Sequence, residues 1–146
     1  MRLGAFLPYR LAIVADAVSR SVSSVYAERF DLSRDEWRVL AALGESGTMK
    51  TREALLCTTL DKVQVSRALA RMEGKGLVFR EEDAEDRRNK VLRLTAQGEA
   101  LYRRIVPLVQ EREAQLLSAL EPRERALLGS ALDRILESAR ALARSD

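Results

Sequence analysis

The chain has 146 residues, of which 47% are hydrophobic and 32% are charged, with 25 Lys and Arg against 22 Asp and Glu. This length suits one compact domain or two lobes that share a core, and a net charge of +3 does not by itself indicate a nucleic-acid partner. The single cysteine excludes an intrachain disulfide, and the lack of histidine removes the commonest general base and metal ligand. We therefore expect no enzyme, no cofactor and no metal site.

The first predicted element is a long amphipathic helix over Phe6 to Phe30. Its apolar residues recur at spacings of three or four, which places them on one face. Pro8, Arg10 and Asp16 interrupt the apolar run, which stays well short of the roughly 20 residues that cross a membrane. We expect a cytoplasmic protein without a signal peptide or membrane contact.

Three further helices are predicted next. Residues 33–36, Ser-Arg-Asp-Glu, have the form of a capping box and start a helix that runs to about Leu43. A short helix covers roughly Lys50 to Cys57, and a tight turn follows. Asp61 caps the fourth helix, which residues 74–76, Gly-Lys-Gly, bring to an end. Its inward apolar residues are Val65, Leu69 and Met72.

Two short strands, LVFRE and KVLRL, then bracket a charged loop. Thr95 begins a helix that contains Pro107, and a last helix starts near Pro122. The order α-α-α-α-β-β-α-α predicts a mainly helical fold with a small β-hairpin wing, a winged helix-turn-helix. Its parts are an N-terminal dimerisation helix (residues 1–30), a DNA-binding lobe (31–98) and C-terminal dimerisation helices (99–146).

The terminal helices carry apolar stripes that a small central lobe cannot cover completely. Two copies that pack these helices together as a homodimer would bury them. An intrachain bundle of the same helices is the alternative.

The fourth helix has the composition of a DNA recognition helix. Basic residues can neutralise phosphates, a Gln can pair with adenine, and an Arg can grip guanine. An ordinary solvated amphipathic helix would explain this composition equally well. The candidate DNA contacts on this helix are Lys62, Gln64, Ser66, Arg67 and Arg71.

The loop DAEDRRNK favours the DNA-binding interpretation. It places Arg87, Arg88 and Lys90 at a hairpin tip, where an arginine side chain can enter a narrow minor groove. Asp86 is positioned to orient the Arg88 guanidinium, and the acids before it, Asp83 among them, are expected to face solvent. The order of the elements favours a wing over a plain surface turn. A helix is followed by a glycine stop, a strand, a charged tip and a second strand.

The segment LDKVQVSRALARMEGKGLVFREEDAEDRRNKVLRLTAQG closely resembles the signature of MarR-type transcriptional regulators. The shared pattern consists of the D-K-x-x-V-S-R-x-L helix start, the K-G-L-V strand entry and the D-x-R-x(5)-L-T-x-x-G wing. The resemblance implies a homodimeric regulator, typically a repressor, that binds a palindromic duplex. Arg88 matches the family's minor-groove arginine and Asp86 the acid that positions it. The chain departs from the pattern at Thr58-Thr59, where many members have Leu-Gly.

The resemblance also implies release by a small aromatic acid or aryl thioester bound between the dimerisation helices and the lobe. Tyr9, Arg10, Trp37 and Arg38 are the candidates for this pocket. Alternatively, Arg10 snorkels to the surface or pairs across the dimer, and Trp37 is core.

Two other functions stay open. One is a redox response through Cys57, although a buried structural thiol is the favoured interpretation of that residue. The other is a helical protein–protein adaptor, which would have no use for a basic hairpin tip.

Overall fold

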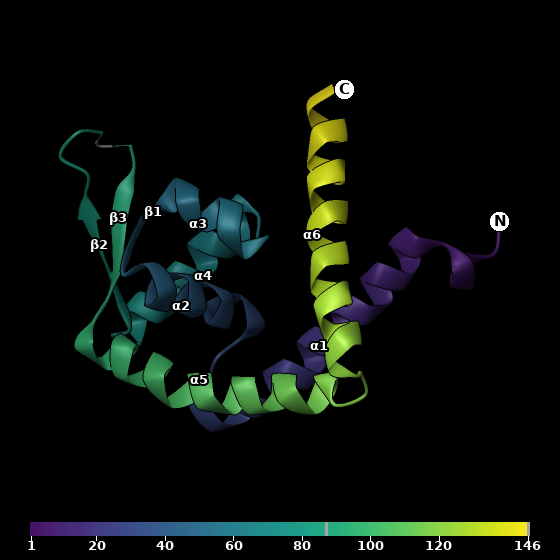
Figure 1. Ribbon diagram of the computed structural model, residues 1–146. Helices are drawn as coiled ribbons and strands as arrows, with labels where there is room; N and C mark the ends of the chain where they lie inside the picture. The colour runs from purple at the N-terminus through teal and green to yellow at the C-terminus, as the bar shows by residue number, and fades with distance from the viewer. Residues whose placement is uncertain (87, 146) are drawn as a thin grey trace. The chain divides into compact units, whose positions relative to one another are not determined.

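The computed structural model describes residues 1–86 and 88–145, and its helices and strands follow the predicted order with two additions (Figure 1). A short 3-10 turn precedes the first helix, and a three-residue strand precedes the third. The fold is the predicted winged helix-turn-helix. The elements are η1 (Leu3–Ala5), α1 (Leu7–Phe30), α2 (Arg34–Ser46), β1 (Thr48–Lys50), α3 (Thr51–Thr58), α4 (Lys62–Gly74), β2 (Val78–Glu82), β3 (Lys90–Leu94), α5 (Ala96–Leu117) and α6 (Pro122–Ser145).

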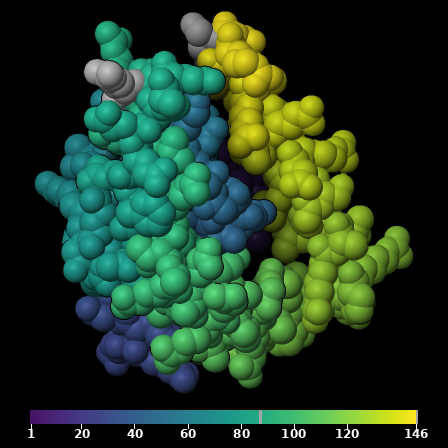
Figure 2. Space-filling view, turned by 90° about the vertical axis from the view of Figure 1, so that its left-hand side faces the viewer, coloured from purple at the N-terminus to yellow at the C-terminus, as the bar shows by residue number. Residues whose placement is uncertain are grey.

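The sheet is antiparallel, with the strand order β1-β3-β2. In the hairpin, Val78 lies opposite Leu94 and Glu82 lies opposite Lys90, so β2 and β3 match the two predicted strands. Strand β1 was not predicted, because three residues between a glycine turn and a helix are too few to show an alternating pattern. Viewed from the hairpin side, β2 and β3 lie at the front of the lobe (Figure 2).

The chain divides into two compact units, Met1–Gln110 and a second that begins at Glu111. The core of the first unit draws side chains from α1, α2, α4, β3 and α5, and full burial of each stabilises the fold by roughly 1.5–3 kcal/mol. Val65, Leu69 and Met72 are at most 1% exposed, which confirms the predicted inner face of α4. The largest fully buried side chains include Tyr26, Leu40, Leu43, Leu69, Met72, Leu92 and Ile105.

Apolar side chains remain exposed on α1 and on α6 in the single chain. On the N-terminal half of α1 they include Leu7, Ile13 and Val14. Those on α6 keep 39–68% of their surface exposed, and they are Leu127, Leu128, Leu132, Ile135, Leu136 and Leu142. None of the helices in the described parts of the chain is long and apolar enough to span a bilayer.

The start of α2 corrects one detail of the sequence analysis. Ser33 Oγ accepts the backbone N–H of Glu36 at 3.1 Å, as a helix cap should. The predicted return bond from the Glu36 carboxylate is replaced by contacts with α4, so only half of the predicted capping box forms. At α4 both halves are present, because Asp61 accepts the N–H of Gln64 at 2.8 Å and Gln64 Oε1 accepts the N–H of Asp61 at 3.0 Å.

The wing is joined to α5 through a close backbone contact. The Thr95 N–H donates to the Leu77 carbonyl at 3.0 Å, and the Thr95 hydroxyl donates to the Gly76 carbonyl at 2.6 Å. Thr95 Oγ1 in turn accepts the N–H of Gly98 at 3.0 Å. A Cβ at Gly98 would stand 2.1 Å from the Leu77 carbonyl oxygen, so this approach requires glycine.

We predict that Gly98→Ala destabilises the protein by about 1–3 kcal/mol or more, because backbone atoms must move to admit the methyl group. Gly74→Ala is the matched control, since its Cβ would enter open space and alanine favours the helix by at most about 1 kcal/mol. Urea unfolding followed by circular dichroism measures both variants. Equal midpoints for Gly98→Ala and the wild type would contradict the predicted clash.

Candidate nucleic-acid interface and adjoining pocket

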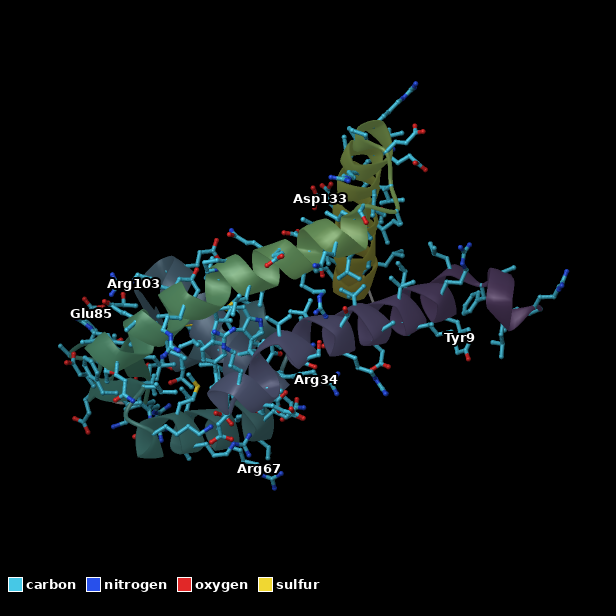
Figure 3. The ribbon with its side chains drawn as sticks, turned by 90° about the horizontal axis from the view of Figure 1, so that it is seen from below. Tyr9, Arg34, Arg67, Glu85, Arg103 and Asp133 are labelled. Atoms are coloured by element: carbon cyan, nitrogen blue, oxygen red, sulfur yellow. The ribbon has the colours of Figure 1, made fainter. Side chains whose placement is uncertain are left out.

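The N-terminal two turns of α4 present a polar face to solvent. Lys62, Gln64, Ser66 and Arg67 are all exposed, and Arg67 projects outward from α4 (Figure 3). Among the residues that the structure describes, neither Lys62 nor Arg67 forms an ion pair, so both charges are available to a ligand. The Oε1 atom of Gln64 already accepts the N–H of Asp61, which fixes the amide beside the start of the helix.

Arg71, the fifth candidate on this helix, has a different environment. Its Nε lies 3.2 Å from Glu36 Oε1, and Lys75 Nζ lies 2.8 Å from Glu36 Oε2. Glu36 is only 3% exposed. A buried carboxylate held by a cation of α4 and by the cation that directly follows this helix fixes α4 firmly, because losing either cation leaves an incompletely paired charge. Arg71 therefore anchors α4 to α2.

The hairpin tip is organised by Asp86. Its Oδ1 accepts the backbone N–H of Arg88 at 3.0 Å, and its carbonyl accepts the N–H of Asn89 at 3.1 Å. The carboxylate thus fixes the backbone of Arg88, whereas the sequence analysis expected it to hold the guanidinium. The Arg88 side chain is exposed and has no ion pair within the described ranges. Arg87 lies outside those ranges.

The start of the hairpin loop is held by a charge pair that the sequence analysis did not identify. Asp83 was expected to face solvent, but it is only 9% exposed, and its Oδ2 lies 3.1 Å from Lys50 Nζ. Its Oδ1 accepts the Glu85 N–H at 3.1 Å. The Glu85 N–H and then Lys50 lower the pKa of Asp83, and the Asp83 carboxylate raises the pKa of Lys50. Lys90, the remaining candidate here, lies 3.4 Å from Glu82 across the hairpin.

A hollow of about 510 Å³ lies between α2 and the end of α3. We call it the α2–α3 hollow. Trp37 and Arg38 line it together with Cys57, whose thiol is exposed, so the expected burial of this cysteine is wrong. The Trp37 ring packs against Tyr26, with 5.3 Å between centroids, and burial raises the pKa of Tyr26 to about 12.

The other two pocket candidates lie elsewhere in the single chain. Tyr9 and Arg10 are exposed on the N-terminal part of α1, where Figure 3 labels Tyr9, and neither lines the α2–α3 hollow. The structure thus brings together two of the four predicted pocket residues.

Comparison with known proteins now identifies the chain. A family model described as the MarR family matches residues 30–89. The transcriptional regulator HosA of Escherichia coli O157:H7 is 30% identical over 97 residues, which cover 66% of this chain and 72% of HosA. The chain belongs to the MarR family. It is therefore a DNA-binding transcriptional regulator and not an enzyme. The regulator FarR of Neisseria gonorrhoeae is 32% identical over 98 residues, or 67% of this chain and 66% of FarR.

Solved structures of MarR-family proteins share the fold. The PcaV regulator of Streptomyces coelicolor superposes with a TM-score of 0.82 at 21% identity, covering 95% of this chain and 97% of PcaV. NadR in complex with 4-hydroxyphenylacetate gives a TM-score of 0.77 at 26% identity, covering 90% of this chain and 92% of NadR. This MarR-family regulator thus shares the fold of its winged lobe with these proteins. Within that lobe, the ion pairs of Glu36 and Asp83 set the local positions of α4 and the hairpin loop.

We predict that the Asp83–Lys50 pair makes the stability of the regulator sensitive to acid. Because the pKa of Asp83 in the folded protein lies below its usual 3.8, its stabilisation is present above that usual value and is lost as the pH falls through the lowered pKa. Asp83→Asn should therefore be less stable than the wild type near pH 7, and this difference should shrink toward pH 3.

Urea unfolding at each pH measures the effect, and Glu82→Gln serves as the control because its carboxylate is exposed. A difference between Asp83→Asn and the wild type that stays constant across this range would show that the carboxylate charge is not what holds the hairpin.

Proposed function

We propose that this MarR-family regulator represses its target as a homodimer on a palindromic duplex and is released by a small aromatic acid or its thioester. The observation that carries the proposal is the free positive charge at two separate elements of one lobe. Lys62 and Arg67 on α4 and Arg88 on the hairpin are exposed and carry no ion pair in the described structure, whereas Arg71, Lys75 and Lys50 are used internally. Unpaired cations on a helix and on a hairpin suit a major groove and the minor groove beside it.

The apolar surfaces of α1 and α6 support the dimer. Leu128, Leu132 and Ile135 recur on α6 at spacings of four and three, which places them on one face. Such a stripe is costly to leave in water, and a second copy would cover it with an identical stripe around a two-fold axis. The two-fold axis would then place two recognition helices on one side of a duplex, with half-sites separated by about 10 base pairs between centres.

The α2–α3 hollow supports the effector. Its volume lies within the roughly 300–1,000 Å³ typical of small-ligand sites, and Trp37 and Arg38 are both among its lining residues. This pair suits a ligand with an aromatic body and a carboxylate. NadR has been solved with 4-hydroxyphenylacetate, and DNA binding by BpsR of Bordetella bronchiseptica is regulated by 6-hydroxynicotinic acid. Tyr9 and Arg10 remain candidates for the part of the pocket that the dimer completes.

The first experiment is selection of bound duplexes from a random library by the purified protein. We predict a palindrome whose half-sites are about one helical turn apart. Gln64→Glu should change the preferred base at one position per half-site from adenine toward cytosine, because a carboxylate accepts from the cytosine amino group and cannot donate to adenine N7. Glutamate at this position also preserves the cap at Asp61, so the helix start remains intact. Recovery of no sequence above background, at low salt with folded protein, would favour the adaptor function.

The second experiment tests the wing. Arg88→Ala should weaken binding to every sequence, most at operators with AT-rich flanks, because the narrow minor groove there has the most negative potential. The slope of log affinity against log salt should become shallower by about one. Arg103→Ala, which removes an exposed arginine of α5 paired with Glu99, should leave both quantities unchanged. An Arg88→Ala protein with wild-type affinity and slope would exclude the hairpin from the DNA interface.

A further inference from the structure

The first turn of α4 carries an exposed apolar side chain that the packing of the lobe does not use. Val63, the second residue of this helix, keeps 55% of its surface exposed. It is absent from the hydrophobic side chains that pack against the core of the described chain. Single exposed valines are common on protein surfaces, so the direction in which Val63 points decides whether it has a function.

Val63 lies near the centre of the outer face of α4. The buried side chains of Val65 and Leu69 belong to the inner face, and with about 100° between successive residues Val63 points roughly 160° away from Val65. Ser66 and Arg67 follow it by three and four positions on the same outer face, where Arg67 projects outward (Figure 3). The N-terminal residues of a recognition helix are the ones that reach base edges in the major groove. Val63 therefore occupies a position that would meet a base.

The cap of α4 holds Val63 in this direction. Asp61 accepts the N–H of Gln64 at 2.8 Å, and Gln64 Oε1 accepts the N–H of Asp61 at 3.0 Å, so the residues on both sides of Val63 are bonded to each other. A valine in a helix is also restricted to one strongly preferred χ1 rotamer. Its two methyl groups thus have little conformational freedom to lose when they contact a ligand.

An apolar side chain at this position suits one feature of the major groove. Every base presents hydrogen-bonding groups there, but thymine alone adds an apolar one, its 5-methyl group, and small apolar side chains contact that methyl. Against any other base, Val63 would remove water from donors or acceptors and offer no hydrogen bond in return, which is costly. Its neighbours Lys62 and Gln64 supply the polar groups of the same turn.

We propose that Val63 is a specificity-determining residue, whose methyl groups contact the 5-methyl group of one thymine in each half-site. This contact rests on the proposed function above, because it requires DNA against α4, but it does not depend on the effector. A protein partner is a poorer occupant of the same surface. The apolar area is a single side chain beside the exposed cations Lys62 and Arg67, and the centres of protein–protein interfaces are depleted of charged residues.

Deoxyuridine substitution tests the contact, because deoxyuridine lacks only the 5-methyl group of thymidine. In the duplex recovered by selection, each thymine is replaced in turn, at the equivalent positions of both half-sites, and affinity is measured for the wild type and Val63→Ala. At one such position we expect deoxyuridine to weaken wild-type binding by roughly fourfold per half-site, the effect of exposing one buried methyl group. Val63→Ala should bind the two duplexes about equally. Comparing both proteins on both duplexes cancels any effect of the missing methyl on the DNA itself.

Two further variants separate recognition from a structural effect. Val63→Ile keeps a branched apolar side chain and should keep the preference for thymine. Leu56→Ala is the matched control, because it removes an apolar side chain of α3 that is 78% exposed, and it should respond to deoxyuridine as the wild type does. Alanine favours a helix more than valine does, so Val63→Ala should remain folded, which circular dichroism checks.

Three results on the recovered duplex would overturn the inference while leaving DNA binding established. The first is a wild type that is insensitive to deoxyuridine at every thymine. The second is a loss of affinity that persists unchanged in Val63→Ala, which would assign the methyl group to another residue. The third is Val63→Ala binding that is weakened equally on thymine and deoxyuridine duplexes throughout. Selection that recovers no sequence would overturn this contact together with the proposed function.

Discussion

The buried carboxylate of Glu36 determines how the recognition helix is presented. It is 3% exposed and is paired with Arg71 of α4 and with Lys75, the residue that directly follows α4. Desolvating a carboxylate is costly, and the two cations offset that cost only while α4 keeps its position against α2. This constraint therefore sets the direction in which the four exposed candidate DNA contacts on the outer face of α4 point. A helix fixed by apolar packing alone could rotate or slide more readily, because dispersion contacts are not directional.

A second nearly buried carboxylate, also paired with a cation, positions the wing. Asp83 is nearly buried and pairs with Lys50 at the end of β1, so the charged loop leaves the sheet from a fixed point. Asp86 then fixes the backbone at Arg88, and that arginine remains exposed. The carboxylates that hold the scaffold are thus paired and nearly buried, whereas Lys62, Arg67 and Arg88 of the proposed DNA interface are exposed and have no ion pair in the described parts of the chain. In the proposed function, this division lets a protein with a net charge of only +3 present a basic surface to a duplex.

The sequence predicted the elements well because their local signals are strong. The Asp61 cap, the glycines after α4 and the two alternating strands fixed boundaries that the structure reproduces within a residue or two. The small strand β1 was missed because it carries no periodicity of its own. The partners of Asp83 and Glu36 were missed for a different reason. Each pairs with a residue more than 30 positions away in sequence, and a local pattern cannot report which distant side chain will face it.

The case of Glu36 shows why a local pattern can mislead. At the third position of α2 a glutamate fits a capping box, and the Ser33 half of that box does form. The Glu36 carboxylate nevertheless binds its tertiary partners, because two cations in a sheltered site bind it more strongly than one backbone N–H at a helix end. The same residue is followed directly by Trp37 and Arg38 of the α2–α3 hollow. Successive residues of a helix differ by about 100° in direction. The side chains that line the hollow and the Glu36 carboxylate that binds Arg71 and Lys75 therefore lie on different faces of the same helix, α2. A ligand that shifts α2 would therefore move Glu36 with it, and Arg71 and Lys75 would carry that shift to the recognition helix.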